Sequence, residues 1–195
     1  MGFERLQDSE VRVLGPYRLR TTLEEADVRR LRVGDIAYLS GVVFTMRDMA
    51  HLRALELLRR GEKLPFELKG GIIYHCGPLV KGNTVVSAGP TTSMRMERSE
   101  PDLIGFTGLR GIIGKGGMGN GTREALKKHG AVYLEYPGGA GALAARAAKR
   151  ILNVYWKDLG EPEAVWVIEV SDFGPCFVTM DSNRETLRKK GKQSR

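Results

Sequence analysis

Two glycine-bounded stretches carry the side chains best suited to hold an anion. Residues 89–96 place three consecutive hydroxyls, at 91–93, close to the guanidinium of Arg95. Residues 114–119 read Gly-Lys-Gly-Gly-Met-Gly and present Lys115 in a loop too glycine-rich to cover it. Hydroxyls, fixed cations and the free backbone donors of a helix start all stabilise negative charge. The two stretches therefore predict an anion site, although one of the hydroxyls could equally cap the helix that follows.

A third group of polar residues begins the clearest helical pattern in the chain, residues 47–60. Small and apolar side chains recur there at helical spacing, and Gly61 ends the pattern. Arg47 and His51 are four residues apart, so they project from one face, a turn from each other. They could join the anion site, or they could be a surface arginine and an ordinary, partly buried histidine.

The glycine loop also supports a different interpretation. It satisfies the pattern G-x-G-x-x-G between a strand-like run, 109–113, and an expected helix, 122–129. The next expected strand ends at Glu135, where a dinucleotide-binding fold places the carboxylate that binds the ribose. Against this interpretation, we expect Gly121 to lengthen the loop before the helix begins. A dinucleotide-dependent oxidoreductase is kept as an alternative of another enzyme class.

The composition limits the fold. The 195 residues are 42% hydrophobic, enough for one good core, so we expect a single compact domain. Expected strands and helices are interleaved, which predicts an α/β fold with a mixed sheet and flanking helices. The expected elements include a helix over 22–31, strands over 36–40 and 42–45, a helix over 140–150, and strands over 164–170 and 173–180.

The charge balance leaves three classes of partner open. A formal net charge of +8 suits nucleic acid, an anionic surface or anionic small molecules. Several of the positive charges lie in a basic tail, 188–195, which we expect to be disordered. A nucleic-acid-binding protein is therefore the less favoured, non-enzymatic alternative.

The cysteines and the hydropathy exclude other classes. Cys76 and Cys176 are far apart and lack paired spacing, so the sequence indicates neither a disulfide framework nor a metal site on this chain. No run approaches the roughly 18 apolar residues of a membrane span. We expect a cytoplasmic protein that does not bind a membrane.

Four motifs together resemble a known family. They are Arg47 to His51, Gly89 to Met96, Gly114 to Met118, and Phe173 to Pro175. In order and in separation they resemble the β subunit of class I iron-sulfur hydro-lyases, which are the two-subunit class I fumarases and L-tartrate dehydratases. Four ordered motifs are far more specific than one glycine pattern. The likeness covers about residues 17–187.

The resemblance implies a fold and a partner. It implies a swivelling β/β/α domain over 17–187, preceded by an N-terminal extension, 1–16, and followed by the basic tail. Such a domain closes over an α subunit that carries a four-iron four-sulfur cluster, held by three cysteines. The two scattered cysteines here fit that division, so the cluster is expected on the partner.

The resemblance also implies roles for individual residues. Thr91 stands where the family has its proposed base, and Arg47, Arg95 and Lys115 stand where cations bind the substrate carboxylates. A threonine is a poor base unless nearby cations stabilise its alkoxide or a relay removes the proton. His51 is the candidate relay or general acid.

The implied activity is the reversible addition of water to a dicarboxylate. The expected reaction is (S)-malate to fumarate and water, with L-tartrate dehydratase and mesaconate hydratase as alternatives within the family. These substrates differ by a methyl or a hydroxyl, which the shape of both subunits would discriminate. The sequence does not determine the choice among them.

Overall fold

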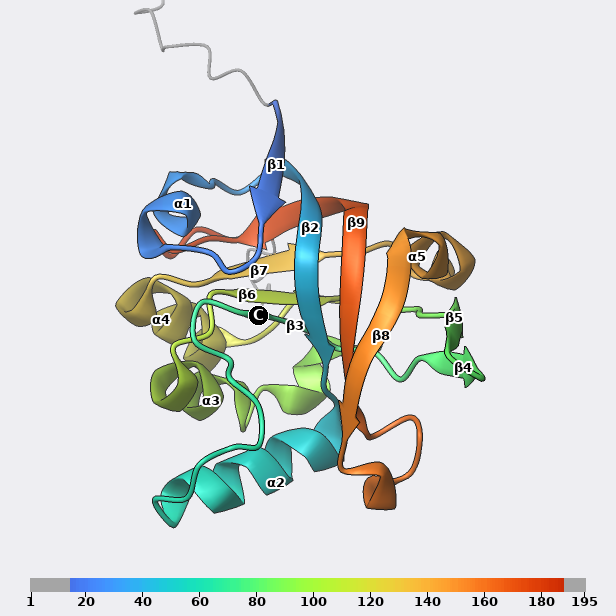
Figure 1. Ribbon diagram of the computed structural model, residues 1–195. Coiled ribbons are helices and arrows are strands. Elements are labelled where there is room, and N and C mark those ends of the chain that lie inside the picture. Colours follow the sequence, from blue (N-terminus) through green and yellow to red (C-terminus); the bar gives the residue numbers. More distant parts are fainter. Residues whose placement is uncertain (1–14, 188–195) are drawn as a thin grey trace, which may run out of the picture.

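The computed structural model describes residues 15–187 (Figure 1). Most of the predicted N-terminal extension and all of the predicted basic tail, 188–195, lie outside the described residues. The strands are β1 (Pro16–Arg20), β2 (Ile36–Thr45), β3 (Ile72–Tyr74), β4 (Leu79–Lys81), β5 (Thr84–Ser87), β6 (Gly111–Gly114), β7 (Val132–Glu135), β8 (Ala148–Tyr155) and β9 (Val165–Met180). The helices are α1 (Glu25–Arg30), α2 (Asp48–Arg59), α3 (Glu100–Thr107), α4 (Asn120–His129) and α5 (Gly141–Ala147), with short 3-10 helices at Ser93–Met96 and Lys157–Leu159.

Seven of these strands form one sheet, in the order β1-β2-β3-β6-β7-β9-β8. Strands β1, β2, β3, β6 and β7 are parallel to one another, whereas β9 is antiparallel to β7, β8 and β2. Because β2 pairs with both β3 and β9, the hydrogen-bonded ladder closes on itself through β2, β3, β6, β7 and β9. Strands β4 and β5 form a separate hairpin beside α5 (Figure 1).

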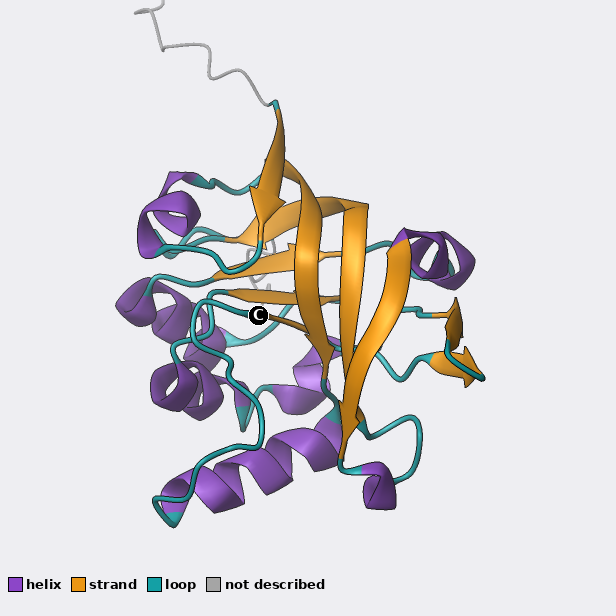
Figure 2. Ribbon diagram, in the orientation of Figure 1, coloured by secondary structure: helices purple, strands orange, loops and turns teal. Residues whose placement is uncertain are grey.

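Two hydrophobic cores hold the sheet and the helices together. One core contains Ala54 of α2, Leu103 of α3 and Leu126 of α4, and Figure 2 shows these three helices grouped on one side of the strands. The second core joins α1 and α5 to the strands around Tyr74 and Phe173, whose ring centroids are 5.2 Å apart. Burying one large apolar side chain contributes roughly 1.5–3 kcal/mol to the stability of the fold. The two cores therefore hold the helices against the sheet and fix the ends of the strands.

The single mixed α/β domain is confirmed, but two expected pairs of strands are continuous. The segments 36–40 and 42–45 are one strand, β2, because Gly41 adopts a φ of +115° at a bulge against β9 and the ladder continues past it. The segments 164–170 and 173–180 are likewise one strand, β9, although Asp172 between them has a φ of +49°. Gly41 and Asp172 locally favour a break in the strand, but hydrogen bonding to distant strands keeps each segment continuous.

Three expected helix boundaries also differ. The helix expected over 140–150 ends at Ala147, because the next residues pair with β9 as strand β8. The helix expected from residue 22 begins at Glu25, and its capping box is formed by Glu24 and Asp27. Gly121 lies inside α4 instead of lengthening the loop before it.

The parallel strands bring one set of loops to a common edge. The carboxyl ends of β2, β3, β6 and β7 meet there, the usual location of binding sites in open α/β sheets. The segment 90–93 lies between two of these strand ends, since Pro90 bridges Cys76 beyond β3 and Thr92 bridges Lys115 beyond β6. This edge carries the residues that the sequence singled out.

Within residues 15–187, the helices are too short or too polar for any of them to cross a membrane.

Candidate active site

The sheet edge brings together residues from three distant motifs. Arg47 follows β2 and is the N-cap residue of α2. Thr91 and Arg95 lie in the segment between the ends of β3 and β6, and Lys115 directly follows β6. Their backbones are joined at two points: the Thr91 N–H donates to the carbonyl of His75 at 2.7 Å, and the Ser93 N–H donates to the carbonyl of Lys115 at 3.0 Å.

The hydroxyl of Thr91 is oriented by a guanidinium. Arg95 Nη1 donates to Thr91 Oγ1 at 3.0 Å. The other edge of the same guanidinium binds Asp48, with Nε 3.2 Å from Oδ1 and Nη2 in contact with Oδ2. Partial burial would raise the pKa of Asp48, but hydrogen bonds from Arg95 and from the backbone, with the charges of Arg95 and Arg47, hold that pKa below its usual range. Asp48 therefore stays ionised and fixes Arg95 beside Thr91.

Arg47 is held by a second carboxylate. Its Nε lies 3.3 Å from Glu163 Oε1, and Glu163 Oε2 also accepts the backbone N–H of Met49 at 3.0 Å. A Cβ on Gly77 would lie 2.5 Å from Arg47 Nη1, so the guanidinium occupies space that only glycine leaves open. The Arg47 side chain is 22% exposed, which keeps part of the guanidinium accessible at the edge.

Lys115 has no such carboxylate. Its side chain is half-buried and lies along Gly138, where a Cβ would be 3.9 Å from Nζ. Among residues 15–187 its ammonium takes part in no ion pair. A cation without a protein counter-ion, beside two arginines, favours an anionic ligand at this edge.

His51 lies beneath this surface. Its side chain is 0% exposed, with Nδ1 2.8 Å from the Arg47 carbonyl oxygen and Nε2 3.0 Å from Glu100 Oε2. The structure thus places His51 next to Arg47, as helical spacing predicts, but under the site instead of in contact with the surface that Thr91 shares. Its role as relay or acid stays a prediction.

Sequence reasoning did not predict that four other buried polar residues lie beside His51, although Ser93 was among the hydroxyls at 91–93. Glu100, His75 and Ser93 are fully buried and join His51 in one hydrogen-bonded chain that ends at Tyr133. Glu100 and the two histidines have donor atoms within 4.8 Å of one another, a set that could also bind a metal ion. The one signal in the sequence was the glycine at position 114, where a Cβ would lie 1.8 Å from Ser93 Oγ.

The glycine loop is arranged unlike a dinucleotide site. Glu97 accepts hydrogen bonds from the N–H of Gly119 at 2.7 Å and from the N–H and hydroxyl of Thr122 at 3.2 and 2.6 Å. Its carboxylate therefore occupies the N-terminus of α4, where a pyrophosphate would have to bind.

The described residues do not fit an iron-sulfur cluster. Such clusters are held by cysteine thiolates. Cys76 and Cys176 are free and 0% exposed. Burial raises the pKa of Cys76 to about 12, against a smaller opposing effect of Arg47, and raises the pKa of Cys176 as well, so both remain protonated thiols.

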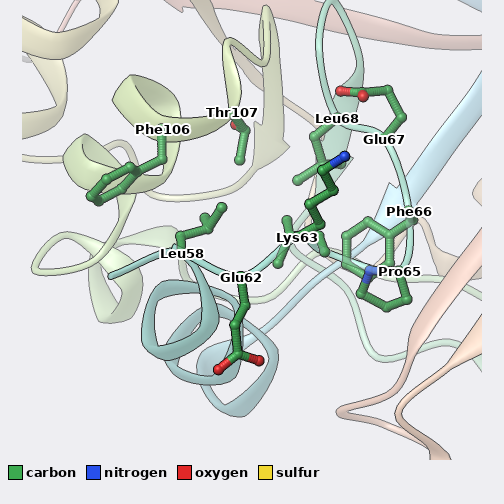
Figure 3. Close-up of a pocket in the computed structure, with 10 residues that line it drawn as sticks. Leu58, Glu62, Lys63, Pro65, Phe66, Glu67, Leu68, Phe106 and Thr107 are labelled. Atoms are coloured by element: carbon green, nitrogen blue, oxygen red, sulfur yellow. The ribbon is translucent and has the colours of Figure 1, made fainter. Parts of the chain in front are cut away.

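One hollow lies away from the sheet edge. It has a volume of about 500 Å³ and is formed by the end of α2, the segment 62–68 and the end of α3. Figure 3 shows the side chains that line it, among them the apolar Leu58, Phe66 and Phe106. Among its described lining residues one cation, Lys63, faces two carboxylates, so this hollow does not suit a doubly charged anion.

Comparison with known proteins places these features in a family context. Residues 6–191 match the protein-family model described as Fumarase C-terminus. The chain is 48% identical over 170 residues to a Methanocaldococcus jannaschii protein provisionally named L(+)-tartrate dehydratase subunit beta, a match that covers 85% of this chain and 87% of that protein. It is 42% identical over 173 residues to the L(+)-tartrate dehydratase subunit beta of Escherichia coli K12, covering 87% and 85%.

A third relative is longer. A Geobacillus stearothermophilus protein provisionally named fumarate hydratase class I is 40% identical over 185 residues, which are 92% of this chain but 34% of that protein. The resemblance indicated by the four sequence motifs is confirmed by these matches.

Proposed function

Because the chain belongs to the Fumarase C-terminus family, we propose that it is the β subunit of a two-subunit hydro-lyase that adds water to, or removes it from, a dicarboxylate. The observation that carries this proposal is the Thr91 hydroxyl, held at 3.0 Å by Arg95 on a sheet edge that also presents Arg47 and Lys115. A reactive hydroxyl among three cations matches the needs of a substrate with two carboxylates. In this proposal the domain is a swivelling β/β/α domain that closes over its partner.

The three cations bind and orient the substrate. Arg47 and Arg95 present planar guanidinium groups that suit a carboxylate, and Lys115 adds a point charge that is not neutralised by the described chain. Because Asp48 and Glu163 each hold one arginine, the guanidiniums stay in place before the substrate binds. The same ion pairs distinguish this edge from the open basic surface of a nucleic-acid-binding protein.

Thr91 serves as the base. Elimination transfers a carbon-bound proton to its oxygen, the electron pair of that C–H bond forms the C=C bond, and the C–O bond to the departing hydroxyl breaks. The hydrogen bond from Arg95 favours the alkoxide form that accepts the proton. The addition of water reverses these changes with the same groups.

The leaving hydroxyl needs a Lewis acid that this chain does not supply. We assign it to a four-iron four-sulfur cluster on a partner α subunit, since the two buried thiols here cannot bind one. The names of the relatives that match over most of their length contain "subunit beta", which fits a chain that is active only with a partner.

The substrate is a hydroxylated four-carbon dicarboxylate or its methylated analogue. L(+)-tartrate comes first because the relatives that match over most of both chains carry that name. (S)-Malate and fumarate come next, through the longer relative named for fumarate hydratase. Mesaconate is the third candidate, and the enzyme is expected in the cytoplasm, where free thiols such as Cys76 and Cys176 stay reduced.

The test uses the complex purified anaerobically after co-expression of this chain with its candidate α subunit. We expect turnover of tartrate, malate or fumarate only by the complex, and Thr91→Ala lowers kcat by about 10²–10⁴-fold without loss of assembly. Thr84→Ala, an exposed threonine on β5, is the control and keeps the wild-type rate. An assembled wild-type complex that turns over none of the dicarboxylates, or a Thr91→Ala variant with the wild-type kcat, contradicts the proposal.

A further inference from the structure

A continuous chain of buried polar side chains lies under the sheet edge. Its centre is Glu100, in the first turn of α3, whose Oε2 is 3.0 Å from His51 Nε2 and 2.9 Å from His75 Nε2. His75 Nδ1 is in turn 2.9 Å from Ser93 Oγ, and the hydroxyl of Tyr133 donates to the same Oγ at 2.9 Å. All the members are buried.

The positions of the protons follow from the partners. The Arg47 carbonyl can only accept, so His51 Nδ1 carries a hydrogen, and its Nε2, which faces a carboxylate, carries a second. His51 is therefore an imidazolium. Because Tyr133 donates to Ser93, the proton of Ser93 is free to bind His75 Nδ1, which leaves His75 neutral with its hydrogen on Nε2.

The electrostatic environment agrees with this assignment. Desolvation alone would lower the pKa of His51, but the charge and hydrogen bond of Glu100, and the Arg47 carbonyl, raise it above its usual value. For His75 desolvation prevails over Glu100 and lowers the pKa. Desolvation would raise the pKa of Glu100, but the two histidines lower it to about 2, so Glu100 is a carboxylate.

The hydrogen-bonded side chains on either side of Glu100 each lead to a segment of the proposed active site. His51 holds the carbonyl of Arg47, at the N-cap of α2. The backbone of His75 accepts the N–H of Thr91 at 2.7 Å, and the backbone of Ser93 donates to Lys115 at 3.0 Å. One carboxylate thus connects the three segments that carry the base and the cations.

We infer that Glu100, His51, His75 and Ser93 form a positioning unit that sets the relative placement of Arg47, Thr91 and Lys115. This inference rests on the proposed function for its catalytic meaning. None of the four side chains reaches the substrate, because all are buried. Glu100 acts by keeping His51 charged and by orienting both imidazole rings, so the three surface segments keep one arrangement.

The first test measures catalysis in the assembled complex with Glu100→Gln. The amide is neutral, so His51 loses the counter-ion that keeps it charged. Both imidazole Nε2 atoms contact the same oxygen, Oε2, so a neutral His51 turns a lone pair towards the oxygen that still accepts from His75, and one arm of the unit is lost. We expect kcat to fall about 10–100-fold, since a displacement of about 1 Å at a catalytic group costs of that order. The matched control is Asp181→Asn, which changes an equally buried carboxylate at the opposite edge of the sheet and leaves kcat unchanged.

The second test reads the protonation states directly in the full chain labelled with ¹⁵N-histidine. The chain has three histidines, so the spectrum is simple. We expect one imidazolium (His51) and one neutral ring protonated on Nε2 (His75) at pH 7, with the third ring, His129, titrating separately. Glu100→Gln converts the His51 signal to a neutral ring, and Asp181→Asn leaves all three signals unchanged.

The same samples separate the failure of this inference from the failure of the proposed function. Backbone amide signals of Thr91 and Lys115 shift in Glu100→Gln but not in Asp181→Asn, whatever substrate the enzyme uses. Absence of dicarboxylate turnover by the wild type therefore rejects the proposed function alone. Unchanged kcat and unchanged amide signals in Glu100→Gln overturn the positioning unit.

Two further outcomes also overturn it. Two neutral or two charged rings in the wild type contradict the assigned protons. One equivalent of a transition metal that is bound in the wild type and lost in Glu100→Gln would show that the three residues form a metal site instead. If Glu100→Gln does not fold, Ser93→Ala replaces it, because it removes the hydrogen bonds of Ser93 to His75 and Tyr133 and leaves the contacts of Glu100 with both histidines in place. It is expected to lower kcat about 2–10-fold and, among the three histidine signals, to change that of His75 alone.

Discussion

Two fully buried carboxylates lie at opposite edges of the sheet and are held by different kinds of partner. Asp181, just after β9, accepts only backbone N–H groups, from Val33 at 3.1 Å, Asn183 at 2.8 Å and Glu185 at 3.1 Å. Among residues 15–187, the partners of Glu100 are side-chain donors alone, His51 and His75. The first arrangement fixes a turn, whereas the second builds a titratable unit.

The difference shows how a buried charge can be assigned a role. Backbone donors are present wherever the chain turns, so a carboxylate that satisfies them serves the fold. Two buried histidines are themselves costly, and a fold gains little from assembling them with a carboxylate. Such a group is expected where chemistry occurs, and it lies directly under the proposed active site.

The largest expected effect sharpens the contrast between the two edges. Arg95→Ala removes the guanidinium that orients Thr91, and we expect kcat/KM to fall about 100–1,000-fold. Arg184→Ala removes an arginine near Asp181 that pairs with Glu124, and we expect no change. The measurement is steady-state kinetics of the anaerobic complex. Equal losses in the two variants would remove the functional distinction between the edges.

The second effect concerns stability. Glu100→Gln removes the negative charge of a buried ion pair, so the free energy of unfolding is expected to fall by about 3–5 kcal/mol. Asp181→Asn retains one acceptor oxygen and is expected to cost about 1–3 kcal/mol. Urea unfolding of the three full-length chains measures both. A larger loss in Asp181→Asn would reverse this ranking of the two carboxylates.

The third effect is the pH dependence of stability. The pKa of His75 is lower in the folded chain than in the unfolded chain. As pH falls below 6.5, the unfolded chain therefore binds a proton at His75 before the folded chain does, and the free energy of unfolding falls. The pKa of His51 is higher in the folded chain than in the unfolded chain. As pH rises above 6.5, the unfolded chain releases the proton of His51 while the folded chain keeps it, so the free energy of unfolding falls until the folded pKa is reached.

These two groups therefore place a maximum near pH 6.5, with slopes of up to about 1.4 kcal/mol per pH unit on each side. The measurement is urea unfolding across pH 5–8, with the curve of Glu100→Gln subtracted to remove the other groups. We expect the alkaline slope to vanish in that variant, since His51 loses its counter-ion. An alkaline slope that persists there would show that Glu100 does not hold the proton on His51.

The residues that the sequence singled out lie mostly at the surface of the candidate site. Thr91, Arg95 and Lys115 stood out through short-range patterns of hydroxyls and glycines, Arg47 was assigned through the family resemblance, and the fold places all four at one edge. The support depends on residues far apart in the chain. Glu100 in particular reads as an ordinary acidic residue in the first turn of an exposed helix, and only the packing of α3 against α2 buries it.

The same limit applies to the fold. The mixed α/β domain and most elements followed from local periodicity and turn residues. The joining of expected strands into β2 and β9 did not, because it depends on pairing between the start and the end of the chain, such as Phe44 with Val167. Local signals at Gly41 and Asp172 favoured breaks that this pairing bridged with irregular backbone.

The closure of the ladder by β9 has a consequence for biosynthesis. The segments that carry Arg47, Thr91, Arg95 and Lys115 all lie before residue 116, but β2, which leads into Arg47, finds its antiparallel partner only in residues 167–177. A chain still emerging from the ribosome would expose that side of β2 and the core around Phe173. Contacts this distant in sequence slow folding, so the domain is expected to complete only after synthesis, and assembly with another subunit must wait for that last strand.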